Sequence, residues 1–167
     1  MKKRLVACGY FILFLLPCLS LIYFLDSLQF ELKPLQLLIA RISYKVLHMK
    51  YEVELNGSTI IVLHKNRLSS FEISRDSTGW KGILLLAALI FSTPYVKLSK
   101  KFKHFLLLSP FLFLVNLARI ISSIMIGIEY GMKAFNFWHS ILWSYGFVCC
   151  AITMWGIWLI LAYAKKI

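Results

Sequence analysis

The sequence predicts an all-α membrane protein, built as a four-helix transmembrane bundle with a small extracytoplasmic β-hairpin. Of its 167 residues, 60% are apolar and only 16% are charged, whereas soluble domains average about 45–50% apolar and 25% charged residues. Four apolar runs approach the ~20 residues that a helix needs to cross a bilayer. The net charge is +12, and we interpret it as a topology signal rather than a nucleic-acid-binding surface. A soluble enzyme and a disordered chain are excluded, and residues 1–167 are treated as a single integral membrane domain.

The predicted helices cover residues 5–25, 80–96, 105–128 and 137–164. The first contains no charged residue, the third is interrupted once by Arg119, and the fourth only by His139. The second is short, but Lys81 near its start could snorkel to the interface and extend it. The first apolar run is too long for the core of a cleaved signal peptide and lacks a small-residue cleavage site, so we expect an uncleaved helix.

The basic residues beside these helices predict the orientation. On one side of the membrane the predicted loops and termini carry nine basic residues and no acidic residue. The basic residues are Lys2, Lys3, Arg4, Lys97, Lys100, Lys101, Lys103, Lys165 and Lys166. The positive-inside rule makes this side cytoplasmic, with both termini inside. The segment 26–79, which has seven bases and six acids, is then extracytoplasmic.

The extracytoplasmic segment has two predicted parts. Residues 29–49 mix apolar and basic side chains and could form an interfacial helix lying on the membrane. Residues 51–55 alternate between polar and apolar side chains, Asn56-Gly57 follows, and residues 58–63 are β-type. An Asn-Gly pair between two such runs predicts a β-hairpin.

Three polar features within or beside the helices require an explanation. Arg119 lies nine residues before the end of its predicted helix, about 14 Å below the outer surface at 1.5 Å per residue, so it must face the bundle interior, water or a partner. His139 opens the last predicted helix, where a solvated interfacial histidine is the simpler interpretation. Ser77 precedes the second helix, where it could cap the free N–H groups or act as a nucleophile whose oxyanion those groups stabilise.

These three residues would meet at one membrane face. In the predicted topology Ser77, Arg119 and His139 all lie in the outer half of the bundle, which brings together a hydroxyl, a cation and a base. Lys81, one helical turn after Ser77, also permits a serine–lysine dyad. The histidines and cysteines show no metal-ligand spacing, and the four cysteines give no disulfide framework.

At these residues the chain resembles the exosortase/archaeosortase family of multi-pass, transpeptidase-like membrane enzymes. That family carries a nucleophile motif of the form C-[ST]-G before an apolar helix, then an arginine in a later helix, then a histidine. The counterparts here are Ser77-Thr78-Gly79, Arg119 within Asn116–Arg119, and His139 after Phe137-Trp138. The resemblance extends over residues 74–144 and departs at one position, because Ser77 stands where the family usually has cysteine.

The resemblance implies a membrane protease or transpeptidase whose substrates are secreted proteins with C-terminal sorting signals. Ser77 would be the nucleophile, His139 the base that a serine requires, and Arg119 a fixed positive charge. A lipid or amine acceptor would release the product, and the chemistry requires no cofactor. Two alternatives stay open: a family member that binds its target without catalysis, or a non-enzymatic four-helix protein such as an assembly factor or small transporter subunit.

Overall fold

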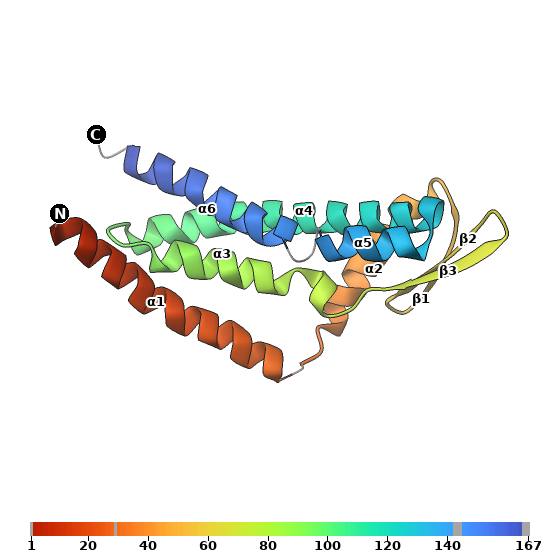
Figure 1. The fold of residues 1–167 in the computed structure, drawn as a ribbon, viewed down its shortest axis with the longest axis horizontal. Helices are drawn as coiled ribbons and strands as arrows, with labels where there is room; N and C mark the ends of the chain where they lie inside the picture. Colours follow the sequence, from red (N-terminus) through yellow and green to blue (C-terminus); the bar gives the residue numbers. More distant parts are fainter. Residues whose placement is uncertain (1, 29, 142–144, 165–167) are drawn as a thin grey trace. The chain divides into compact units, whose positions relative to one another are not determined.

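A computed structural model describes residues 2–28, 30–141 and 145–164, and within them the chain forms six helices and one three-stranded sheet (Figure 1). In chain order the elements are α1 (Lys2–Ser27), α2 (Lys33–His48), β1 (Glu52–Asn56), β2 (Thr59–His64), β3 (Arg67–Glu72), the 3-10 turn η1 (Asp76–Thr78), α3 (Trp80–Ser92), α4 (Leu98–Tyr130), α5 (Met132–Ile141) and α6 (Phe147–Ala164).

The chain divides into two compact units. The first unit combines Met1–Phe30, Trp80–Phe113 and Phe147–Ile167, and the second combines Glu31–Gly79 and Leu114–Gly146. Helix α4 therefore contributes its first half to one unit and its second half to the other.

The first unit is built from apolar helices. Helix α3 packs beside α1 and α6 (Figure 1). Its core is a cluster of buried side chains from α3, α4 and α6, comprising Leu86, Ile90, Leu112, Phe147, Ala151, Met154 and Trp158. Helix α3 approaches α6 closely at Gly82, because a Cβ there would clash with the ring of Phe147.

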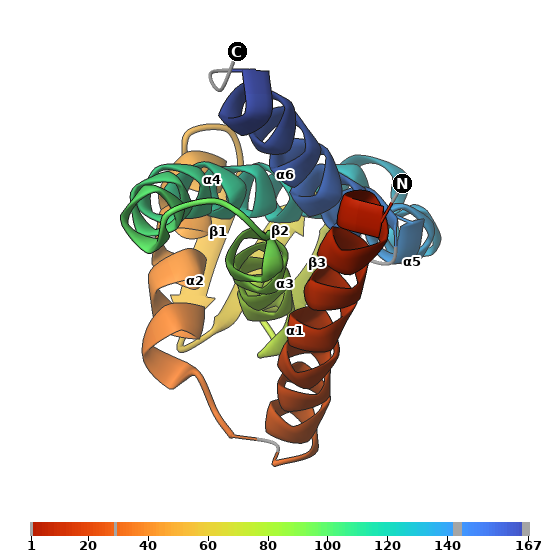
Figure 2. The same cartoon turned by 90° about the vertical axis from the view of Figure 1, so that its left-hand side faces the viewer.

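The second unit contains the sheet, with strand order β1-β2-β3 and antiparallel pairing throughout (Figure 2). Ile60 and Val62 alternate with more exposed residues along β2 and are buried. Helix α2 packs on the sheet and buries Ile39 and Leu47. The amide of Gln36 donates to the carbonyl of Ile73 at 3.0 Å, which fixes α2 to the chain that follows β3.

The predicted hairpin is confirmed, and the sheet is larger than predicted. Strands β1 and β2 pair from Glu52↔Leu63 to Asn56↔Thr59, and Gly57 takes the left-handed conformation at φ 58° that the turn requires. The third strand was not predicted. It follows a second tight turn in which Lys65 and Asn66 both have positive φ values, 50° and 58°. Lysine is not a typical turn residue, so the sequence did not indicate a turn here.

The helical content is confirmed, but the four-helix bundle is not. Helix α1 matches the prediction, α3 ends four residues early, and α4 is longer than predicted at both ends. The predicted helix 137–164 is divided between α5 and α6, and its residues 142–144 lie outside the described part of the chain, as do Lys165 and Lys166. His139 therefore lies in the last turn of α5 and not at the start of a long helix.

Two helices of the described chain are long and apolar enough to cross a membrane: α1 from Leu5 to Ser27, and α4. Helices α3 and α6 are apolar but shorter. The residues 29–49 that were expected to form an interfacial helix do contain a helix, α2, whose buried face packs on the sheet; Gln29 lies outside the described residues.

Candidate active site

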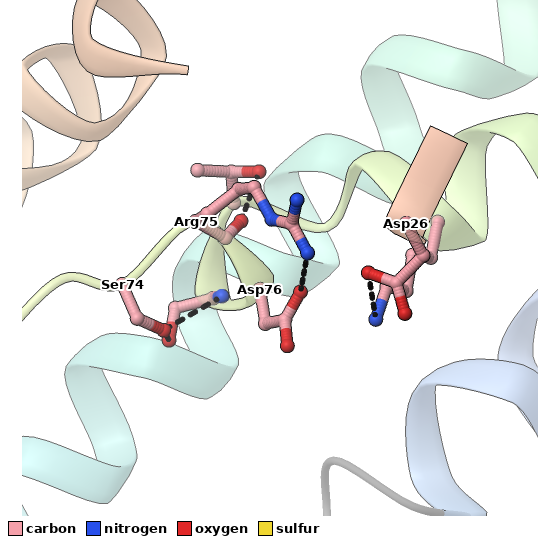
Figure 3. A network of polar contacts seen from close by, with 7 residues as sticks. Asp26, Ser74, Arg75 and Asp76 are labelled. Carbon is pink, nitrogen blue, oxygen red and sulfur yellow. Dashed lines mark hydrogen bonds and ion pairs between the residues drawn. The ribbon is translucent and has the colours of Figure 1, made fainter. Parts of the chain in front are cut away.

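Ser77 lies in the turn η1, within the second unit. The hydroxyl of Thr78 donates to the carbonyl of Arg75 at 2.7 Å, and the turn closes at Gly79, which has a φ of 79° that favours glycine. Asp76 forms an ion pair with Arg75 at 3.7 Å (Figure 3). The turn is therefore fixed by local bonds from both its backbone and its side chains.

The hydroxyl of Ser77 is buried, with 6% of the residue exposed. Its oxygen lies 3.0 Å from the hydroxyl oxygen of Ser74, and the Ser77 amide donates to that Ser74 hydroxyl at 3.3 Å (Figure 3). Ser74 is thus the residue that holds the Ser77 side chain in its present position.

Asn116 connects this turn to α4. Its Nδ2 donates to the carbonyl oxygen of Ser77 at 2.9 Å, and the residue is fully buried. Within the described residues its Oδ1 accepts no hydrogen bond. Arg119 follows three positions later on the same helix, where residues i and i+3 share a face, and it too is buried, at 8% exposed.

His139 lies in the last turn of α5, outside the two helices long enough to span a membrane. Its ring stacks on Phe135, with centroids 5.1 Å apart, and Phe135 in turn packs edge-on against Phe71 of the sheet. Burial lowers the pKa of His139, and the positive charge of Arg119 lowers it further. Both causes favour the neutral imidazole, the form that can accept a proton.

The structure places all three predicted residues in the second unit. A direct hydrogen bond joins Ser77 to Asn116, and electrostatics couples Arg119 to His139. Among the described hydrogen bonds, the Ser77 hydroxyl is paired with Ser74 and not with His139. The serine–lysine dyad gains no support, because the ammonium of Lys81 binds the carboxylate of Asp26 at 2.9 Å (Figure 3).

The comparison with known protein families decides the classification. The sequence pattern of one known family, described as transmembrane exosortase, matches residues 2–158 of this chain. The chain belongs to the transmembrane exosortase family. No curated protein and no solved structure matches it.

Family membership confirms the resemblance found in the sequence and extends it over nearly the whole chain, including α1, α2 and the sheet. The chain is therefore an integral membrane protein of a family of transpeptidase-like enzymes. Within the described residues, no group of three histidine, cysteine or acidic side chains is placed to hold a metal ion.

Two residues that hydrogen-bond to Ser77 were not predicted as site residues. Ser74 carries a detectable signal, because serines three residues apart before a helix are typical of a hydrogen-bonded turn. Asn116 entered the sequence comparison only as the first residue of the Asn116–Arg119 motif, and its bond to Ser77 joins residues 39 positions apart. A contact of that separation leaves no trace in a single sequence.

Proposed function

We propose that this protein is a membrane-embedded protease or transpeptidase that cleaves C-terminal sorting signals of secreted proteins at the outer membrane face. Ser77 is the nucleophile, His139 the base, and Arg119 the fixed cation. One observation carries this proposal: the turn that holds Ser77 is hydrogen-bonded to Asn116, one helical turn before an arginine whose charge reaches His139. Three chemically complementary groups from distant parts of the sequence are thereby joined in one unit.

In the first step Ser77 Oγ attacks the carbonyl carbon of the scissile peptide while its proton passes to the imidazole of His139. The carbonyl oxygen becomes an oxyanion, which the guanidinium of Arg119 stabilises. The tetrahedral intermediate collapses, the C–N bond breaks, and the leaving amine takes the proton from His139. The product of this step is a serine ester of the sorted protein.

In the second step a nucleophile attacks that ester and transfers its proton to His139. The ester bond to Ser77 breaks, and Ser77 Oγ regains the proton. An amine or lipid acceptor gives transpeptidation, and water gives hydrolysis. Both outcomes use the same residues.

The serine changes what the neighbouring residues must do. A thiol is acidic enough for nearby cations to hold it as thiolate, but a serine hydroxyl must lose its proton during the attack. The base must then be neutral before the reaction. The lowered pKa of His139 supports this role, because burial and Arg119 both disfavour the imidazolium.

The substrate class comes from the family. A C-terminal sorting signal combines a short motif, an apolar helix and a basic tail. The basic tail would stop on the cytoplasmic side with the basic residues around Lys97. The motif would then lie at the outer face, where we place Ser77.

A binding-only function is the second candidate, and one observation favours it. The Ser77 hydroxyl is paired with Ser74 rather than with His139. In the catalytic scheme, substrate binding must turn this hydroxyl from Ser74 towards the base; catalytic hydrogen bonds often tighten only in the substrate complex. In the binding-only scheme the Ser74 pair is permanent.

The test compares the wild type with Ser77→Ala and Ser77→Cys in membranes containing a precursor with a C-terminal sorting signal. Ser70→Ala is the matched control, because Ser70 is an exposed serine of β3 in the same unit. We expect Ser77→Ala to abolish cleavage, Ser77→Cys to retain part of it, and the control to cleave like the wild type. If Ser77→Ala processes the precursor at the wild-type rate, Ser77 is not the nucleophile. If wild type binds the precursor without cleaving it, the binding-only function is correct.

A further inference from the structure

The first unit contains a cavity of about 360 Å³ near the end of α3 and the start of α4. Tyr10 and Phe14 of α1 line one wall, and the segment from Phe91 to Tyr95 lines another. Lys101, in the first turn of α4, completes it. These residues belong to the first unit, whereas the proposed catalytic residues belong to the second, and they have no part in the proposed chemistry.

Lys101 differs from the other lysines around it. Its ammonium donates to the carbonyl oxygen of Phe91 at 2.6 Å, which holds it at the cavity wall. Lys97, Lys100 and Lys103 are exposed, whereas Lys101 is half-buried. An ammonium has three N–H donors, so the bond to Phe91 leaves two with which Lys101 can bind an anion.

The cavity is amphipathic. Tyr10 and Phe14 lie four residues apart, on one face of α1, and present aromatic rings to the cavity. Its polar lining residues include Lys101, Thr93 and Ser92, a buried residue whose hydroxyl has no hydrogen-bond partner among the described residues. Such a cavity suits a ligand with an anionic head and an apolar chain.

The charge of the residues around the cavity favours an anionic head group. Residues 93–104 contain four lysines and no acidic residue. Basic clusters at the ends of membrane helices, and basic pockets between those helices, bind anionic lipid head groups. The volume is at the small end of the range for ligand sites, so it suits a head group rather than two acyl chains.

We infer that this cavity binds an anionic phospholipid, with the phosphate on Lys101 and an acyl chain along Tyr10 and Phe14. The lipid would cover aromatic side chains of α1 that are otherwise more than half exposed, at 51% and 59%. It would also connect α1 to the α3–α4 end through a shared ligand. This inference is independent of the proposed catalytic function.

The test uses the full-length protein in nanodiscs of phosphatidylcholine that contain a trace of spin-labelled phosphatidylglycerol or spin-labelled phosphatidylcholine. Electron paramagnetic resonance measures the fraction of each lipid that the protein immobilises. We expect wild type to prefer the phosphatidylglycerol label about fivefold, the contribution of one lysine near an anionic head group. Lys101→Gln removes this preference, and Lys101→Arg retains it.

Lys100→Gln is the matched control, because it removes the same charge from an exposed position one residue away. It should keep the preference of the wild type. If the Lys100 and Lys101 variants lose the preference equally, the charge of the whole face attracts the lipid and the cavity site is wrong. If inorganic phosphate displaces the label, the site binds free phosphate and the lipid assignment is also wrong. Circular dichroism of each variant confirms that loss of preference does not reflect unfolding.

Discussion

At the scale of single residues, the active-site proposal depends on two buried polar side chains of α4. A buried amide that lacks a partner is costly, typically by about 1–3 kcal/mol. Asn116 satisfies its donor on the Ser77 carbonyl at 2.9 Å and thereby fixes the backbone of the turn rather than the hydroxyl itself. The hydroxyl stays with Ser74, so its orientation can change while the turn remains in place.

The coupling between Arg119 and His139 predicts a pH dependence. The pKa of His139 is lowered from its usual 6.5 by burial and by the charge of Arg119. Activity requires the neutral base, so the acidic limb of kcat/KM should have its midpoint below 6.5. Arg119→Gln removes one of the two causes, the pKa rises, and the limb should move to higher pH at reduced overall activity.

Measuring kcat/KM of wild type and Arg119→Gln between pH 4 and 8, a range set around the usual histidine pKa of about 6.5, checks this prediction. Arg41→Gln is the control, because Arg41 is an exposed arginine on α2 and its loss changes the net charge equally. In this control the acid limb of the kcat/KM profile should have the same midpoint as in the wild type. An unchanged limb in the Arg119 variant would show that His139 is not the group that titrates.

At the scale of elements, the sequence predicted those whose signal is local. The Asn56-Gly57 pair pointed to the hairpin, and Gly57 is the first of its two turn residues, between Asn56 and its partner Thr59, where a positive φ suits glycine. The start of α5 at Met132 was missed, because Lys133 and Asn136 interrupt the apolar run there and hydropathy alone places the helix start after them. Strand β3 was missed because a Lys65-Asn66 turn has only one residue typical of such turns.

The packing of α3 on α6 predicts a stability change at one glycine. A Cβ at Gly82 would clash with the ring of Phe147, which is itself buried. We expect Gly82→Ala to lower the free energy of unfolding by about 1–3 kcal/mol, the usual cost of overpacking, despite the better helix propensity of alanine. Gly156→Ala is the matched control, since nothing lies within 4 Å of a Cβ there, and it should be neutral or slightly stabilising. Denaturant unfolding in micelles checks both, and equal stability of the two variants would contradict the close approach.

At the scale of the whole molecule, the sequence predicted the class and the family but not the division into two units. Hydropathy identified four apolar regions, and two of the described helices, α1 and α4, are long and apolar enough to cross a membrane. It could not predict that α4 is shared between both units, since that depends on contacts between residues far apart in the chain. The same limit applied at the candidate site, where Ser77, Arg119 and His139 could be selected by residue type but the contact from Asn116 to Ser77 could not.

The arrangement of charge along the chain predicts the topology of the whole protein. The bases around Lys97 should lie inside, and the sheet should lie outside with the proposed active site. Ser70→Cys and Lys97→Cys place a thiol at two exposed positions, one on β3 and one before α4. A membrane-impermeant maleimide added to intact cells should label the Ser70 variant at once and the Lys97 variant only after permeabilisation.

The native cysteines lie within α1 and α6, and labelling of the wild type measures their background. Labelling in the reverse order would place the sheet in the cytoplasm, where Ser77 could not act on a secreted substrate at the outer face.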